Sequence, residues 1–205
     1  AGSAPFTSFG ELEGTRDTYV HFIQQPLDQA SLVRPYSKWE YTLPSGVTVK
    51  ETLRRAHSVM QSDPQGPVYL QLPREILTQR WEIDAIRSFP EERFGPVRVG
   101  GADPKTVEDL AARLIKATNP VLVTAYAGRN AGASAAIETL SRIAGMRVID
   151  LLTFYNIGNG FPHFGGFSLT SLDGIDFGLL VDIDVPWIPA AVGDNPDTYW
   201  AHIDV

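Results

Sequence analysis

The sequence contains no cysteine, no long apolar run and no block of like charges. Without cysteine the chain forms neither disulfides nor thiolate metal sites, and this composition fits a reducing compartment such as the cytoplasm. No apolar stretch reaches the roughly 18 residues that a membrane span needs. The net charge is -7, with scattered lysines and arginines. We therefore expect neither nucleic acid nor a membrane as partner, because phosphate binding needs a clustered positive field.

What the sequence does contain is an ordinary globular composition, with 43% hydrophobic and 20% charged residues. A chain of 205 residues can form one large domain or two small ones. It begins Ala1-Gly2-Ser3 without an initiator methionine, and residues 200–205 show the alternating pattern of a strand. We expect the chain to be a piece of a longer protein. The alternative is that the N-terminus has been processed and that the C-terminal strand is real.

Short strand patterns and helical patterns follow one another in the first part of the chain. Aromatic, β-branched and alternating residues predict strands, and apolar residues at helical spacing predict helices. We expect strands over residues 18–24, 37–42 and 68–72, and helices over residues 26–33 and 47–62. The strand in GPVYLQLPREIL, residues 66–77, is apolar on both faces, as a central parallel strand is, and Pro73 stops it.

Residues 76–102 show neither a strand period nor a helix period. A structureless segment of this length inside one compact domain would be unusual. We therefore interpret it as a linker between a first domain, residues 1–75, and a second domain, residues 103–205.

Strands alternate with helices in the second domain. Asp103 and Pro104 are typical of a helix start, and Gly145 is typical of a helix end. We expect strands over residues 120–126, 146–151, 177–183 and 202–205, a helix that Asp103 caps and Pro104 begins, and a second helix over residues 131–144. This order predicts a parallel sheet with helices on both faces. The predicted fold class is α/β, with two doubly wound parallel-sheet domains, the second of them Rossmann-like.

The residues alone present no complete catalytic set. Residues 125–132, AYAGRNAG, join a strand to a helix without the G-x-G-x-x-G spacing, and form either a nucleotide-binding loop or a tight turn. Asp182, Asp184 and Asp194 either hold a metal near a strand end or cap backbone groups. Among the four histidines, His163 in a glycine-rich loop is the candidate to approach a ligand.

Three stretches of the sequence together resemble a known family. They are RPYSKW (residues 34–39) followed by a helix and by GPVYLQLPREIL, then FIQQPLDQ (residues 22–29), and NPVLV (residues 119–123). They resemble the R-P-x-[ST]-K segment and closing strand, the A-F-Q-E segment and the central domain of thiamine-diphosphate-dependent enzymes of the acetolactate synthase type. The resemblance implies that residues 1–75 are the C-terminal part of an incomplete pyrimidine-binding domain, and residues 103–205 the central domain.

The resemblance also implies a function and cofactors. It implies a homo-oligomeric enzyme that acts on a small 2-oxo acid by decarboxylation or carboligation, with thiamine diphosphate and Mg²⁺ in the parent protein. The family's G-D-G motif and catalytic glutamate lie outside the matched region, and Gly193-Asp194-Asn195 is not that motif. We therefore expect this chain alone to be inactive and assign it no catalytic or metal-binding residue.

Two residues are implied to bind substrate, Gln24 first and Lys38 behind it. An amide at Gln24 donates to a carbonyl or carboxylate without adding charge. Where acetolactate synthases carry G-x-R-F-D-D-R, this sequence reads VDIDVPW, residues 181–187, which argues against FAD. The alternative function is a stand-alone nucleotide-binding or scaffold module of the α/β class.

Overall fold

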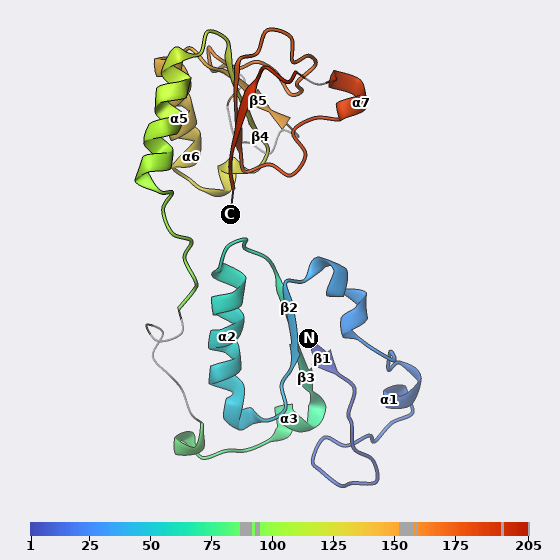
Figure 1. Cartoon of the computed structure of the whole chain (residues 1–205). Coiled ribbons are helices and arrows are strands. Elements are labelled where there is room, and N and C mark those ends of the chain that lie inside the picture. The colour runs from blue at the N-terminus through green and yellow to red at the C-terminus, as the bar shows by residue number, and fades with distance from the viewer. Residues whose placement is uncertain (87–91, 93–94, 152–157, 159, 194, 205) are drawn as a thin grey trace. The chain divides into compact units, whose positions relative to one another are not determined.

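The computed structural model describes residues 1–86, 92, 95–151, 158, 160–193 and 195–204. The chain divides into a first unit, Ala1–Gly100, and a second unit, Gly101–Val205. Each unit has its own sheet, and all strand pairs in both sheets are parallel (Figure 1). The predicted α/β class with two parallel-sheet domains is therefore confirmed.

The first unit is built on a three-stranded sheet of order β1-β3-β2. Strand β3 (Val68–Pro73) pairs with β1 (Gly2–Ser3) on one side and with β2 (Trp39–Thr42) on the other. Helix α2 (Val49–Gln61) connects β2 to β3 and packs against both strands (Figure 1). The central place of β3 is what its apolar pattern predicts. The strands expected over residues 37–42 and 68–72 and the helix expected over residues 47–62 are confirmed.

The strand predicted over residues 18–24 is wrong, because this segment contains helix α1 (Val20–Ile23). Aromatic and β-branched residues favour a strand only where neighbouring strands pair with them. Here Arg16 from the preceding loop donates instead to the carbonyl oxygen of His21 and lies 5.0 Å from the centre of the Phe22 ring. These contacts stabilise one helical turn.

The helix predicted over residues 26–33 is also wrong. Only a 3₁₀ turn, Ala30–Leu32, forms there, followed by a second one at Arg34–Tyr36. The Asp28 carboxylate accepts the backbone N–H groups of residues 30 and 31 at 3.1 and 3.2 Å. An aspartate that binds nearby N–H groups offers the backbone an alternative to a helix.

The segment after β3, expected to be a linker without strand or helix periodicity, contains short helical elements. It begins with helix α3 (Arg74–Thr78), in which Glu75 and Ile76 are buried, and a 3₁₀ turn follows at Ile83–Ala85. Further on, the backbone at Gly95 and Val97 binds serine hydroxyls of the α2 region at 3.0 and 2.9 Å. The described part of this segment therefore makes contacts within the first unit.

The second unit is built on a four-stranded sheet of order β5-β4-β6-β7. Its central strands are β4 (Pro120–Thr124) and β6 (Phe177–Val181), and its edges are β5 (Arg147–Asp150) and β7 (Tyr199–Ile203). The chain passes from β4 to β5 and then returns to the other side of β4. The strand order therefore reverses between β4 and β6. Four strands are found where four were predicted, but the last, predicted over residues 202–205, begins at Tyr199 and ends at Ile203.

Three helices complete the second unit as described. Helix α5 (Pro104–Lys116) begins at Asp103, whose carboxylate accepts the Thr106 N–H at 2.9 Å. Helix α6 (Ala133–Ala144) ends at Gly145, whose φ of +63° is the left-handed cap that favours glycine. Both predicted boundaries are confirmed. A short helix, α7 (Pro189–Val192), precedes β7.

Both faces of the second sheet carry a core. Successive residues of β4 point to opposite faces, so that Leu122 joins one cluster, while Val121 and Val123 join the other. Leucines of α5 and α6 cover the first face, and Trp187 and Trp200 pack against the second. Among the described residues, no helix combines the length and apolarity of a membrane span.

Candidate functional site

Two adjoining hollows lie at the carboxyl ends of the three strands of the first unit. The larger has a volume of about 600 Å³ and the smaller about 390 Å³. Residues that follow β1, β2 and β3 line the larger hollow, and residues of α1 line the smaller. Ligands of open α/β sheets bind outside the carboxyl ends of the strands. These hollows are therefore the candidate site.

The two hollows have a mixed apolar and amide lining. The side chains that line one or both of them include Phe6, His21, Gln24, Gln25, Leu27, Gln29, Leu43, Gln71 and Ile76. None of the described residues that line them is lysine or arginine. The Asp28 carboxylate also lines the larger hollow, but it forms an ion pair with Arg34 at 2.9 Å. The lining suits a small ligand that accepts hydrogen bonds from amides.

Gln24, the residue that the family resemblance implies for substrate binding, lies directly after α1. It is exposed and lines the smaller hollow, while its backbone N–H donates to the carbonyl oxygen of Val20 at 3.1 Å. The structure thus places the Gln24 side chain where a ligand in the smaller hollow can reach it. Its contact with substrate remains a prediction.

Lys38 lies at the other end of the sheet, just before β2. Its ammonium donates to the carbonyl oxygens of Ser62 and Pro64 at 2.6 and 2.7 Å, beyond the end of α2. A lysine at this place stabilises carbonyl groups that have no partner within the helix. The structure therefore does not bring Lys38 together with Gln24, and the predicted contact of Lys38 with substrate remains untested.

Gln25, which the sequence reasoning missed, lines both hollows. Its side-chain oxygen Oε1 accepts a hydrogen bond from Nη2 of Arg16. The same guanidinium binds the end of α1 through the carbonyl oxygen of His21. The two successive glutamines in the sequence could have indicated a second amide at the site. Only the fold shows that Gln25, and not Gln24, lines both hollows.

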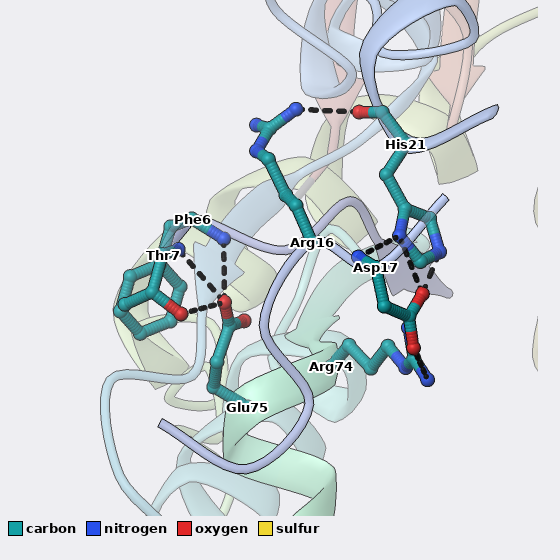
Figure 2. A network of polar contacts seen from close by, with 7 residues as sticks. All are labelled: Phe6, Thr7, Arg16, Asp17, His21, Arg74 and Glu75. Atoms are coloured by element: carbon teal, nitrogen blue, oxygen red, sulfur yellow. Dashed lines mark hydrogen bonds and ion pairs between the residues drawn. The ribbon is translucent and has the colours of Figure 1, made fainter. Parts of the chain in front are cut away.

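A network of polar contacts fixes the segment that carries these glutamines (Figure 2). Arg74 of α3 donates to both carboxylate oxygens of Asp17 at 2.9 Å each, and Asp17 contacts Nδ1 of His21 at 3.3 Å. The hydrogen bond from Arg74 lowers the pKa of Asp17 below its ordinary value. Because His21 belongs to α1, the network joins α1 to α3.

A buried carboxylate anchors the chain just after β1. The Glu75 side chain is almost fully buried, and its Oε1 accepts hydrogen bonds from the N–H of Phe6 and from the N–H and hydroxyl of Thr7, at 2.9, 2.8 and 2.7 Å (Figure 2). Burial by itself raises the pKa of Glu75, but the hydrogen bonds from Thr7, from the Glu75 backbone and from Phe6 together outweigh it and hold the pKa below its ordinary value. Glu75 therefore holds the wall of the larger hollow to α3.

One member of the predicted acidic cluster of the second unit, Asp182, forms an ion pair. Asp182 follows β6 and forms an ion pair with Arg129, with the Arg129 Nε 3.1 Å from the Asp182 Oδ2. The hydrogen bond to Asp182 raises the pKa of Arg129, whose guanidinium lies 5.3 Å from the centre of the Tyr126 ring. This pair lies where the strand order reverses. Asp194 lies outside the described residues.

His163 contacts the body of the second unit. Its carbonyl oxygen accepts the N–H of Val148 at 2.9 Å, and its ring centre lies 5.6 Å from that of Phe161. These contacts connect the glycine-rich loop to β5. The predicted approach of His163 to a ligand is not tested by them.

The described residues do not fit the Mg²⁺ and diphosphate that the family resemblance implies. Within the described ranges, no group of three or more histidines or acidic residues is placed to hold a metal ion. Mg²⁺ needs near-octahedral oxygen ligands, and diphosphate alone leaves positions open. We therefore derive no chemical step through the cofactor.

Solved structures of known proteins share the fold of this chain. Benzoylformate decarboxylase from Polynucleobacter necessarius matches 93% of this chain with a TM-score of 0.62 and 20% identity. The thiamine diphosphate-dependent 4-hydroxybenzoylformate decarboxylase of Rhodococcus jostii RHA1 matches 88% with a TM-score of 0.61 and 20% identity. The fold of the chain is that of thiamine-diphosphate-dependent enzymes.

One curated protein shows the same relationship in sequence. Glyoxylate carboligase of Escherichia coli O157:H7 is 28% identical over 128 residues, which cover 62% of this chain. The predicted resemblance to thiamine-diphosphate-dependent enzymes is thus confirmed, although no protein-family model matches the chain. The chain matches 21% of that carboligase and 38% and 36% of the two decarboxylases, so it corresponds to only part of each.

Proposed function

We propose that the chain is part of a thiamine-diphosphate-dependent enzyme that acts on a 2-oxo acid by decarboxylation or carboligation. The observation that carries the proposal is the similarity of 62% of the chain in sequence to a protein named glyoxylate carboligase, and of 93% and 88% in structure to proteins named as benzoylformate decarboxylases. In this proposal residues 1–75 are the end of the pyrimidine-binding domain, residues 76–102 are the linker, and residues 103–205 are the central domain.

The first unit would contribute the wall that orients the substrate. The hollows at the carboxyl ends of its strands offer amide donors and apolar side chains. Gln24 would donate to a carbonyl or carboxylate oxygen of the 2-oxo acid. When thiamine diphosphate and Mg²⁺ are bound in the complete protein, the cofactor supplies stabilisation of the carbanion. The residues of this chain would bind the substrate and exclude water.

Two features support further parts of the proposal. Large apolar side chains of the first unit are exposed, among them Ile23, Leu27 and Tyr36 at 71%, 109% and 79%. Such a surface favours association with other chains, as in a homo-oligomer.

In the second unit, the Arg129–Asp182 ion pair occupies the place where the strand order reverses, which is where nucleotides bind in open sheets. This favours a structural role for the second unit over FAD binding.

The experiment begins with the coding sequence on both sides of this segment. We expect a strand-end glutamate upstream and a G-D-G motif downstream. The complete protein, loaded with thiamine diphosphate and Mg²⁺, should release CO₂ from a 2-oxo acid such as glyoxylate or benzoylformate. We expect Gln24→Ala to raise the KM about tenfold or more, since a hydrogen bond to a charged group is worth about 1.5–3 kcal/mol.

Two results would contradict the proposal. Start and stop codons that bound this segment alone would favour the stand-alone nucleotide-binding or scaffold module. A complete protein that turns over no 2-oxo acid would exclude the activity. The exposed Gln61→Ala on α2 is the matched control and should leave the KM unchanged.

A further inference from the structure

We propose that Gln25 is a second substrate-binding amide of this site and that Arg16 is the positioning residue that directs it. The inference rests on the proposed function, in which the two hollows receive a 2-oxo acid. It assigns the side chain that binds an oxygen of the acid, and it differs from the role that the family resemblance implies for Gln24.

Gln25 is distinguished among the four residues that the hollows share. Ala4 and Pro26 have no polar side-chain atom. The amide nitrogen of Gln29 already donates to the Gly2 carbonyl at 3.0 Å and to the Tyr69 hydroxyl at 2.9 Å. The amide nitrogen of Gln25 has no acceptor among the residues that the structure describes. Gln25 is therefore the shared side chain whose donor remains for a ligand.

Arg16 determines which end of the Gln25 amide faces the hollows. A guanidinium only donates hydrogen bonds, so the atom it contacts must be the amide oxygen. The guanidinium is itself held by the carbonyl oxygen of His21 (Figure 2). It also lies 5.0 Å from the centre of the Phe22 ring. With its oxygen fixed in this way, Gln25 presents its NH₂ group away from Arg16.

The chemistry of an NH₂ donor defines the ligand atoms. It binds oxygens that accept hydrogen bonds, such as the carboxylate or the adjoining carbonyl of a 2-oxo acid. No lysine or arginine lines the hollows in the described part of the chain, so a neutral donor is what is offered to these oxygens. Gln24 and Gln25 would then bind one acid from neighbouring positions.

The test is a titration of the ¹⁵N-labelled 205-residue chain with benzoylformate, followed by NMR. We expect the side-chain NH₂ resonances of Gln25 to shift to saturation. Gln25→Met keeps the length of the side chain, removes the donor, and should raise the Kd about tenfold. Gln61→Met, an exposed glutamine on α2, is the matched control and should leave the Kd unchanged.

Arg16 requires a readout that a merely structural role would not change. Arg16→Met should weaken binding severalfold and abolish the shift of the Gln25 NH₂ resonances, while the remaining spectrum stays dispersed. Arg16→Lys, which retains one donor, should restore part of both. Gln25→Glu retains the contact with Arg16 but removes the NH₂ donor, and it should weaken binding at least as much as Gln25→Met. It serves as the second variant if Gln25→Met does not fold.

The outcomes separate the inference from the proposed function. If benzoylformate binds and shifts Gln24 while Gln25→Met and Gln25→Glu bind as the wild type does, the inference about Gln25 is wrong and the substrate site stands. If the wild-type chain shows no saturable shift, the substrate site of the proposed function is wrong, and this inference falls with it. Unchanged binding by Arg16→Met would remove the positioning role.

Discussion

At the residue scale, Glu75 shows how a single carboxylate determines the path of the chain. Its Oε1 takes all three hydrogen bonds that Phe6 and Thr7 offer, across nearly seventy residues of sequence. A buried carboxylate is tolerated only where hydrogen bonds compensate its lost hydration. Because residues 6 and 7 follow β1, these three hydrogen bonds also hold β1 in the sheet.

We predict that Thr7→Val destabilises the chain by about 1.5–3 kcal/mol, because it removes one hydrogen bond to a charged group.

We predict that Glu75→Gln lowers the free energy of unfolding by an amount that depends on pH. The pKa of Glu75 is lowered in the folded state, so its stabilisation is present above the unfolded pKa and is lost as the pH falls through the folded pKa. Urea unfolding from pH 7 downward should show the wild type and Glu75→Gln converging.

The control for this prediction is Glu82→Gln, since Glu82 is exposed. Its unfolding free energy should remain within about 0.5 kcal/mol of the wild type. A constant gap between Glu75→Gln and the wild type down to the lowest pH would contradict the ionised, hydrogen-bonded carboxylate described above.

At the element scale, the pairing of β6 with β7 depends on a glycine. A Cβ atom at Gly178 would lie 2.0 Å from ring carbons of Trp200, its register partner. The Trp200 ring occupies this space and packs against Trp187, with ring centres 4.7 Å apart. A strand position without a side chain thus lets an aromatic ring cover the sheet.

We predict that Gly178→Ala destabilises the second unit by about 1–3 kcal/mol, the usual cost of forced overpacking. Thermal unfolding measures the change. The control is Gly101→Ala, at which a Cβ atom meets nothing within 4 Å. A second substitution, Trp200→Leu, should cost less in the Gly178→Ala chain than in the wild type. Equal stability of Gly178→Ala and Gly101→Ala would contradict the close approach.

At the scale of the whole molecule, the chain corresponds to only part of each solved relative. Its relatives among solved structures are more than twice its length, since it covers 38% and 36% of them. The described residues include no group of ligands fit for Mg²⁺.

We predict that the 205-residue chain alone binds no thiamine diphosphate tightly and is catalytically inactive. Calorimetry with thiamine diphosphate and Mg²⁺ should show no saturable heat in the micromolar range, because the oxygen ligands that Mg²⁺ needs are not assembled. The complete protein is the positive control. Tight, Mg²⁺-dependent binding would mean that the acids near β6 form a metal site, and Asp182→Asn would then abolish it.

The sequence by itself determined the α/β class, the central strands, and the helix boundaries at Asp103 and Gly145. These follow from local rules: apolar runs form buried strands, Asp103 caps a helix, and Gly145 adopts the left-handed backbone that ends one. The motifs also determined the family resemblance, because R-P-x-[ST]-K and the closing strand are both read directly from the residues.

Only the tertiary structure decided the conformation of residues 18–33 and which residues line the candidate site. Arg16 and Asp28 bind backbone groups within this segment, and Arg74 of α3, more than fifty residues away, holds it through Asp17 and His21. No periodicity reveals these contacts. Lys38 and Gln24 are separated by the length of the strands, while Gln25 comes to lie between two hollows. Such placements depend on contacts between segments distant in sequence, whose energies a local pattern does not contain.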